Sequence, residues 1–158
     1  MAVSKAEVDR RMQRLVDTCR QKGLKVTHQR MEVFRELAGT EEHPDAESIY
    51  QSVRRRVPAI SRDTVYRTLA SLESQGLVRK AEVLSGKGRY DANMDRHHHF
   101  VCTKCGLVRD FYSEPLDDLP IHPAVKTFGE IESAHVEVRG ICSACAQRKG
   151  KTRPRRSE

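Results

Sequence analysis

The first half of the chain repeats apolar residues every three or four positions, which is the spacing of amphipathic helices. From Val8 to Cys19 the pattern predicts one such helix, which should stop near Gly23. A second helix is expected after the segment VTHQR, and a third near Pro44, where Asp45 can cap the backbone. The residues expected to face the core are Met12, Leu15 and Val16 in the first helix, Met31, Phe34, Leu37 and Ala38 in the second, and Ile49, Tyr50 and Val53 in the third.

A fourth helix has the clearest boundaries. Ser61 is its predicted N-cap and Gly76 its predicted left-handed C-cap, with an apolar stripe between them. The segment that follows, VRKAEVLSGKGRYDA, alternates around Gly86 and Gly88 as a β-hairpin does. Helices followed by such a hairpin describe a winged helix, in which the helix before the hairpin enters the major groove of DNA.

The outward side of this fourth helix is polar and includes Arg62, Thr64, Tyr66, Arg67 and Thr68. Arginine can hydrogen-bond guanine or a phosphate, and tyrosine can meet a thymine methyl group or the sugar backbone. The pattern therefore favours DNA recognition by this helix. The alternative is an exposed, charged helix of the kind found in any small helical domain.

Four of the five cysteines occur as two Cys-x-x-C pairs, Cys102 with Cys105 and Cys142 with Cys145. Four thiolates satisfy tetrahedral Zn(II) and leave no open position, so the predicted zinc site is structural. The 36 residues between the pairs exceed the spacing of a simple zinc ribbon, so a strand and a short helix are expected to be looped out. Cys19 lies on the apolar side of the first helix and is predicted to be a core thiol.

Three consecutive histidines precede the first cysteine pair. If residues 97 to 101 form a strand, His97 and His99 share one face and His98 points to the other. Asp91 and Asp110 are oxygen donors within reach of that face. Because sulfur already satisfies the zinc, mixed nitrogen and oxygen ligands indicate a second, harder ion such as Fe(II) or Mn(II). The alternative is a solvated polar loop.

Charge and composition indicate the kind of partner and the cellular compartment. The net charge is +7, and the positive surplus lies in residues 1–90 and in the tail 147–158, whereas residues 91–146 are acidic. A basic end suggests a polyanion as partner, and the tail is predicted to be disordered. The chain has no apolar run long enough for a membrane helix and no signal-peptide pattern. We therefore expect a cytoplasmic protein with no membrane partner, in a compartment where paired cysteines bind metal.

Five segments, GLKVTHQR, HPDAESIY, SRDTVYRTLASLESQGLV, RYDANMDRHHHFVCTKCG and GICSAC, occur in the order and approximate spacing of one family. On them the sequence resembles the ferric uptake regulator family of bacterial metal-dependent repressors. The resemblance implies an α+β protein with an N-terminal winged helix-turn-helix domain (residues 1–88) and a small C-terminal α/β dimerisation domain with structural zinc (residues 89–146). Residues 147–158 would form the tail.

The resemblance also implies a mechanism, in which a homodimer binds double-stranded operator DNA when a regulatory metal is bound between the domains. The implied regulatory ligands are His43, Asp91, His97, His99 and Asp110. Of these, His43 follows from the resemblance alone, because it lies in the DNA-binding domain. Lys25 and nearby basic residues are expected at the DNA backbone or minor groove.

An aspartate at position 91, where the iron sensors of the family usually have glutamate, is similar to the peroxide-sensing branch. In that branch hydrogen peroxide oxidises a ligand histidine, here His43 or His97, and DNA is released; the signal is peroxide rather than a small-molecule substrate. Regulation of iron homeostasis without peroxide chemistry is the alternative. A metal-dependent hydrolase, with Glu114 or Asp95 as its base, is a distant one, since no catalytic motif is present and no enzyme is expected.

Three positions depart from the family pattern. His28 stands where proline is common, and Pro120 and Pro123 interrupt a region where a longer helix is usual. An additional metal site found in some relatives would need ligands near His98, Asp117 and His135, and it is not predicted because His135 is out of step.

Overall fold

The computed structural model describes residues 3–82 and 88–149. The chain forms two compact units, Met1–Asp95 and Arg96–Glu158. The division falls later than the expected domain boundary after residue 88, because the second strand of the hairpin pairs with the first and stays with the helices.

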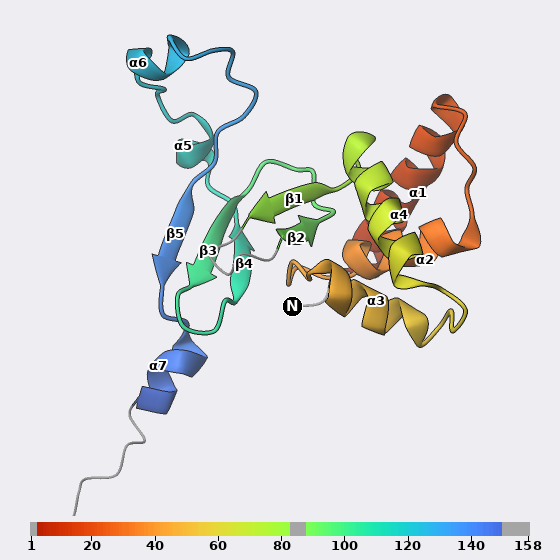
Figure 1. Cartoon of the computed structure of the whole chain (residues 1–158). Coiled ribbons are helices and arrows are strands. Elements are labelled where there is room, and N and C mark those ends of the chain that lie inside the picture. The colour runs from red at the N-terminus through yellow and green to blue at the C-terminus, as the bar shows by residue number, and fades with distance from the viewer. Residues whose placement is uncertain (1–2, 83–87, 150–158) are drawn as a thin grey trace, which may run out of the picture. The chain divides into compact units, whose positions relative to one another are not determined.

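The first unit begins with four helices, α1 (Lys5–Gln21), α2 (His28–Ala38), α3 (Ala46–Arg54) and α4 (Arg62–Ser74) (Figure 1). Each follows a polar N-cap whose side chain accepts a hydrogen bond from a backbone N–H three residues later, and these caps are Ser4, Thr27, Asp45 and Ser61. Gly23 and Gly76, just beyond α1 and α4, have positive φ angles. The four predicted helices and both predicted glycine stops are thus confirmed.

One apolar core holds these helices together. Nearly all of the side chains predicted to face inward are buried, and only Met31 and Val16 remain half-buried. Cys19 is 1% exposed and packs in this core, as predicted from its place on the apolar side of the first helix. The core therefore fixes how α4 sits against α2 and α3, and so which side of α4 faces outward.

A two-stranded antiparallel hairpin completes the unit. It consists of β1 (Arg79–Glu82) and β2 (Gly88–Asp91), with Arg79 opposite Asp91. The hairpin confirms the predicted wing, although the turn expected around Gly86 lies outside the described residues. Four helices and a wing make this unit a winged helix.

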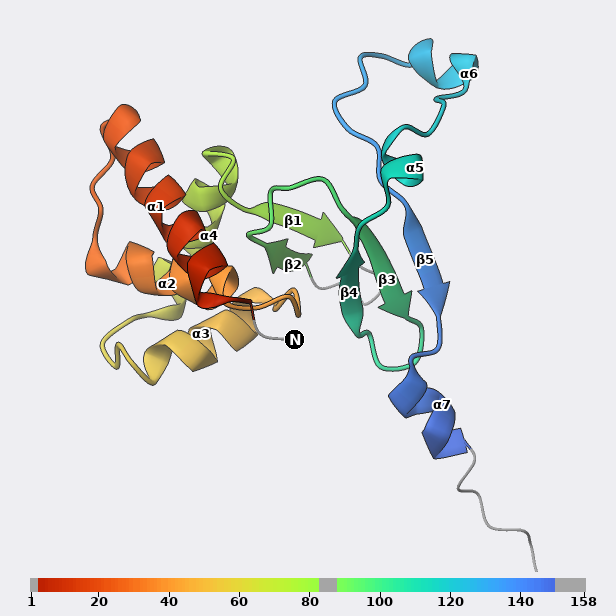
Figure 2. The same ribbon diagram turned by 180° about the vertical axis from the view of Figure 1, so that it is seen from behind.

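The second unit is built on a three-stranded sheet. Its strands are β3 (His98–Cys102), β4 (Val108–Phe111) and β5 (Glu137–Gly140), in the order β4-β3-β5. β3 pairs antiparallel with β4 and parallel with β5. The short helices α5 (Glu114–Asp117) and α6 (Pro123–Lys126) lie in the connection toward one end of the sheet, and α7 (Ser143–Lys149) lies at the other end (Figures 1 and 2).

The connection from β4 to β5 buries little. Pro123 begins α6, and α5 and α6 are four residues long each, in agreement with the shortened helix expected from Pro120 and Pro123. Phe128 is 84% exposed and Tyr112 is 62% exposed in this unit. Side chains from α5 to α6 therefore supply almost no core of their own, which leaves the sheet and the cysteine cluster to stabilise the unit.

None of the helices within residues 3–82 and 88–149 combines the length and apolar character that crossing a membrane requires.

Candidate metal centres and nucleic-acid interface

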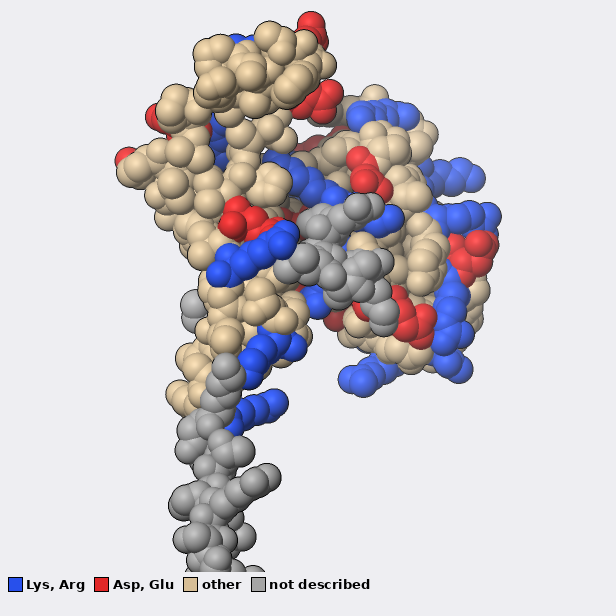
Figure 3. Space-filling model, turned by 60° about the vertical axis from the view of Figure 1, so that its left-hand side comes forward, with Lys and Arg blue, Asp and Glu red and all other residues tan. Residues whose placement is uncertain are grey.

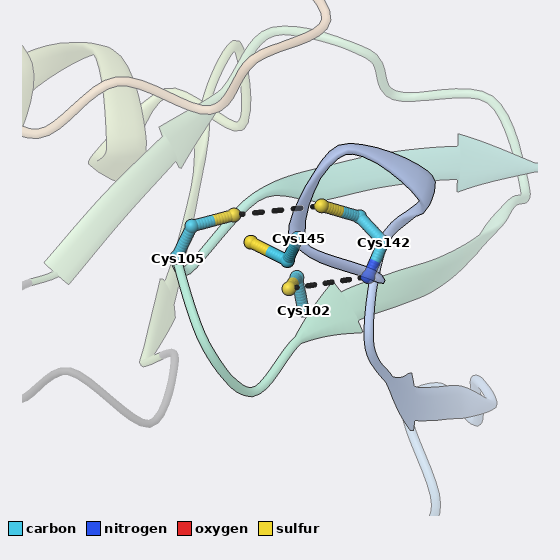
Figure 4. Close-up of side chains that lie close together, drawn as sticks. All are labelled: Cys102, Cys105, Cys142 and Cys145. Atoms are coloured by element: carbon cyan, nitrogen blue, oxygen red, sulfur yellow. Dashed lines mark hydrogen bonds between the residues drawn. The ribbon is translucent and has the colours of Figure 1, made fainter. Parts of the chain in front are cut away.

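The four cysteines of the two Cys-x-x-C pairs meet at one end of the second unit's sheet (Figure 4). Their sulfur atoms all lie within 4.8 Å of one another, and the Sγ atoms of Cys105 and Cys142 are 3.7 Å apart. Four sulfurs bound to one Zn(II) at about 2.3 Å would be about 3.8 Å apart at the corners of a tetrahedron. The cluster therefore fits a structural zinc ion.

The backbone brings the two pairs together in a defined way. In the parallel pairing of β3 with β5, Cys102 lies opposite Gly140, so the chain enters the second pair directly beside the first. A side chain at Gly140 would press on the Phe100 ring, since its Cβ would lie 3.1 Å from that ring. After Cys102 the chain turns at Gly106, whose φ is positive, and its N–H donates to the Cys102 carbonyl at 2.9 Å.

The protonation states of the thiols also favour a metal. The backbone N–H of Cys142 donates to the Cys102 sulfur at 3.3 Å and, with N–H groups of the first pair, lowers the pKa of Cys102 to about 6. Hydrogen bonds with the thiols of Cys105 and Cys142 raise the pKa of Cys145. One thiolate is thus already stabilised by the backbone, whereas ionising all four requires a cation among them.

Three ligand-type atoms of the second unit converge on one face of its sheet. The Nε2 atoms of His97 and His99 are 3.0 Å apart, and they lie 3.7 and 3.6 Å from Oδ1 of Asp110. Asp110 is the cross-strand partner of His99 in the pairing of β3 with β4. Two imidazole nitrogens bound at right angles to one ion at about 2.1 Å would be about 3.0 Å apart. The triangle can therefore present two nitrogens and one oxygen to a single ion.

His98 faces the other way, as the alternation predicted, and it is fully buried. Its Nδ1 accepts the N–H of Val136 at 3.1 Å, so its Nε2 carries the proton and donates to Asp117 at 3.1 Å. The His135 ring instead stacks edge-on against His99, with centroids 6.0 Å apart. His98 and Asp117 are thus hydrogen-bonded neighbours, whereas the His135 ring packs against His99.

The first unit carries two further candidate ligands. Nδ1 of His43 lies 3.8 Å from Oδ2 of Asp91, and both side chains are buried. Hydrogen bonds between the segment before α3 and β2 create this proximity: Tyr90 N–H donates to the Pro44 carbonyl at 3.0 Å, and Arg89 donates to the His43 carbonyl at 3.3 Å. His43 has a φ of 49°, a left-handed conformation that is uncommon outside glycine.

The carboxylate of Asp91 is oriented by the residues after it. Its Oδ1 accepts the backbone N–H of Asn93 at 2.7 Å, and Oδ1 of Asn93 in turn accepts the N–H of Asp95 at 3.2 Å. Asp95 then pairs with Arg10 of α1 at 2.9 Å. Two consecutive Asx turns thus leave Oδ2 of Asp91 toward His43. Sequence reasoning missed Asn93, although an Asn two residues after an Asp is a recognisable turn signal.

The proposed DNA-facing residues occupy the exposed side of the first unit. Tyr66 on α4 is 49% exposed, Thr64 is half-buried and hydrogen-bonded to the Ser61 cap, and Lys25 is exposed just before α2. Arg67 pairs with Asp63 one turn earlier on the same helix at 2.8 Å. Figure 3 shows many Lys and Arg side chains on the helical unit, at the right of the view, with fewer acidic ones among them.

Arg62 is exposed, but side chains of α3 hold its guanidinium group. Its guanidinium makes two hydrogen bonds of 2.9 Å to Glu47 on α3 and lies 4.7 Å from the centroid of the Tyr50 ring. The Glu47 carboxylate raises the pKa of Arg62 further, which keeps it charged. Arg62 would have to leave Glu47 before it could contact a DNA base.

Comparisons with known proteins agree with these features. The sequence model of the Ferric uptake regulator family matches residues 21–139. The Peroxide-responsive repressor PerR of Staphylococcus epidermidis is 28% identical over 147 residues, which cover 93% of this chain and 98% of that protein.

Two solved structures are also similar. The Campylobacter jejuni peroxide stress regulator is 33% identical with a TM-score of 0.66, over 83% of this chain and 98% of that one. The Helicobacter pylori ferric uptake regulator Fur, described as having three functional metal-binding sites, is 26% identical with a TM-score of 0.69, over 88% of this chain and 93% of that one.

Proposed function

Since the chain belongs to the ferric uptake regulator family, we propose that it is a transcriptional repressor whose binding to operator DNA depends on a regulatory Fe(II) or Mn(II). The observation that carries the proposal is the division of the candidate ligands. His43 and Asp91 lie in the winged-helix unit, whereas His97, His99 and Asp110 lie in the unit that holds the cysteine cluster. A ligand set split in this way is suited to coupling the two units.

The coupling follows from linkage. An ion held by His43 and Asp91 together with the three ligands of the second unit binds only the arrangement in which both sets meet. It shifts the population toward that arrangement by its differential affinity for it. In a dimer, holding each winged-helix unit against the second unit of its own chain sets the distance between the two α4 helices. Two operator half-sites require one particular distance.

The donor types support Fe(II) or Mn(II) over a softer metal. Imidazole nitrogens and carboxylate oxygens make up the whole candidate set, and the thiolates are gathered in the separate cysteine cluster. The separation allows zinc to stabilise the second unit while a different ion acts as the regulatory metal. Zinc in the cluster and Fe(II) or Mn(II) in the split site are the proposed cofactors.

We further propose that hydrogen peroxide releases the repressor from DNA. Fe(II) at the site would activate peroxide by giving it an electron that the oxidised ring then returns to the iron, which Mn(II) does far less readily. One oxygen atom of the peroxide is added to a ring carbon of His43 or His97, and the other leaves as water, so the ring loses two electrons. The oxidised imidazole is a poorer ligand, and the coupling between the units fails.

The exposed apolar surface of the second unit supports a homodimer. Most of the large apolar side chains that are exposed among the described residues lie in this unit, Phe128, Val138 and Ile141 among them, and exposed apolar surface of this extent marks an interaction surface. A repressor that reads two half-sites needs two copies of α4. We therefore propose that this unit is the dimerisation unit and that the protein works in the cytoplasm, where the DNA lies.

The test is a brief peroxide pulse on the Fe(II)-loaded and the Mn(II)-loaded protein, followed by DNA-binding titration and peptide mass spectrometry. The Fe(II) form should lose DNA affinity and gain one oxygen on the peptide with His43 or His97. The Mn(II) form should keep both its mass and its affinity.

Two other outcomes redirect the proposal. Loss of binding that tracks zinc release and disulfides among the cysteines would replace the histidine mechanism. Insensitivity to peroxide, with DNA binding that follows the Fe(II) concentration, would make the protein an iron-responsive regulator of iron homeostasis instead.

A further inference from the structure

A small cavity separates α2 from the exposed side of α4. It has a volume of about 190 Å³ and is lined by Arg30 of α2 and by Thr64, Arg67 and Thr68 of α4. The lining residues are thus two arginines and two threonines, with no acidic residue among them. A water molecule takes about 30 Å³ of liquid volume, so the cavity has room for a group several times larger.

The cavity is built by the helix geometry rather than by chance side-chain positions. Thr64, Arg67 and Thr68 are three and four residues apart, which places them on one face of α4. Arg30 approaches that face from the first turn of α2. Two helices fixed by a shared apolar core therefore bring four residues whose side chains can donate hydrogen bonds to one space.

Two of these donors are oriented by neighbours. Oγ of Ser61 and Oγ1 of Thr64 are 2.9 Å apart, and Ser61 also accepts the Thr64 N–H. If the Ser61 hydroxyl donates to Thr64, the Thr64 hydroxyl can still donate into the cavity. Nη1 of Arg30 donates to the carbonyl of Lys25, which steadies its guanidinium and leaves other N–H groups of the fork for a ligand.

Arg67 is the adjustable member of the four. Its pair with Asp63 is 75% exposed on the arginine side and 73% on the aspartate side. Ion pairs at that exposure contribute little to stability, so an anion in the cavity can compete for the guanidinium. The cavity can therefore attract an anion even though Arg67 has a partner.

We infer that this cavity binds one phosphodiester group of the DNA backbone, with Arg30 and Thr68 as contacts in addition to the predicted residues of α4. A phosphodiester is an anion that accepts several hydrogen bonds, and guanidinium and hydroxyl donors are its usual protein partners. The inference rests on the proposed function and deepens it: the cavity would set the position of α4 on the duplex, while Tyr66 on the same helix faces the bases.

The hydrogen bond from Arg30 to the Lys25 carbonyl gives the site a second consequence. It ties the segment that carries Lys25 to the cavity. The backbone contact and the Lys25 contact should therefore be made together. Sequence reasoning placed Thr68 on the outward side of α4 but did not single out Arg30, because the cavity depends on how α2 packs against α4.

The experiment measures the DNA affinity of the Mn(II)-loaded, zinc-containing full chain at several salt concentrations, on a DNA selected by the wild type and on an unrelated duplex. Arg30→Gln should weaken both DNAs alike and make the slope of log Kobs against log salt shallower by about 0.9, because one phosphate is no longer neutralised. Thr68→Val keeps the side-chain shape and should weaken both DNAs by about tenfold with the slope unchanged, because no charge is lost.

Arg35→Gln is the matched control, since it removes the same charge from the same helix outside the cavity. Arg35→Gln should change the slope by less than half as much as Arg30→Gln does. If Arg30→Gln and Thr68→Val both match the wild type, the phosphate site is overturned while the proposed function stands. A loss confined to the selected DNA would show that the residues read bases and would also overturn it. A wild type that binds neither DNA would refute the proposed function, and the phosphate site with it.

Discussion

The Nε2 atoms of His97 and His99 lie 3.0 Å apart on one side of the second unit's sheet. At that distance one ring must donate its proton and the other must accept it, because two unshared lone pairs would repel each other. A divalent ion in place of that proton would satisfy both rings and Asp110 at once. The pair is therefore suited to form half of the proposed metal site before any ion binds.

Replacing one ring should remove the regulatory ion and spare the zinc. For His97→Ala we expect Mn(II) affinity to fall by at least tenfold, since losing a direct ligand costs more than losing a residue behind it. Zinc content should stay at about one per chain, because the cysteine cluster is built separately. Calorimetric titration with Mn(II) and elemental analysis give the two numbers; loss of both metals together would merge the two sites into one.

Replacing a cysteine should have the opposite effect. Cys142 supplies both its own sulfur and the N–H that stabilises the Cys102 thiolate. Cys142→Ser should therefore release zinc and unfold the second unit, whose apolar core is small, while the helical unit keeps its own core. Far-UV circular dichroism would show a partial loss of structure. A Cys142→Ser protein with full zinc and unchanged thermal unfolding would rule out the cluster as a structural site.

Glu7 should contribute to the loss of folding stability at acid pH. Hydrogen bonds from Arg10 and Arg11 lower the pKa of Glu7 to about 2, from 4.5. A depressed carboxyl pKa stabilises the fold above about pH 4.5, and that stabilisation is lost as the pH falls toward 2. Because Arg10 is 57% exposed, we expect Glu7→Gln to lower the free energy of unfolding at pH 7 by only about 1 kcal/mol.

Urea unfolding of Glu7→Gln beside the wild type checks this at two pH values. The gap between the two proteins should be largest at pH 7 and smaller at pH 3, where part of the wild-type contribution is gone. A gap that is unchanged or wider at pH 3 would mean that Glu7 acts through packing rather than through its charge.

Glu47 should restrain DNA binding by holding Arg62. If Arg62 contacts DNA as predicted, Glu47→Gln weakens a charged, bidentate pair to a neutral one and should raise the affinity for selected DNA by about threefold. Asp9→Asn on α1 removes the same charge and should change affinity less. A fall in affinity for Glu47→Gln would instead assign Arg62 to holding α3 against α4.

Local signals explain what the sequence could predict. Ser61 caps α4 through a bond to Thr64, and Gly76 ends it through its positive φ, so both boundaries depend on residues close in the chain. The alternation of His97, His98 and His99 likewise follows from strand geometry alone. Each cysteine pair is a local signal too, and the four ligands that tetrahedral zinc needs joined the two pairs into one predicted site.

The relationships that could not be predicted depend on distant pairing. His43 meets Asp91 because the Pro44 carbonyl accepts the Tyr90 N–H, a contact that no local pattern encodes. The partner of Arg62 is Glu47 on another helix, and the cavity beside Arg30 exists only when α2 packs on α4. Spacing identifies residue types suited to a task, whereas packing decides which of them meet.

The most direct test is the change in DNA affinity caused by Mn(II) in the zinc-containing protein and in two variants, His43→Ala in the first unit and Asp110→Asn in the second. Coupling between two binding sites is typically 5-fold to 150-fold, and we expect Mn(II) to strengthen wild-type DNA binding by about that much. Both variants should lose the increase, because either half of the split site is needed. Equal DNA affinity with and without the ion, or a full response in both variants, would contradict the proposal.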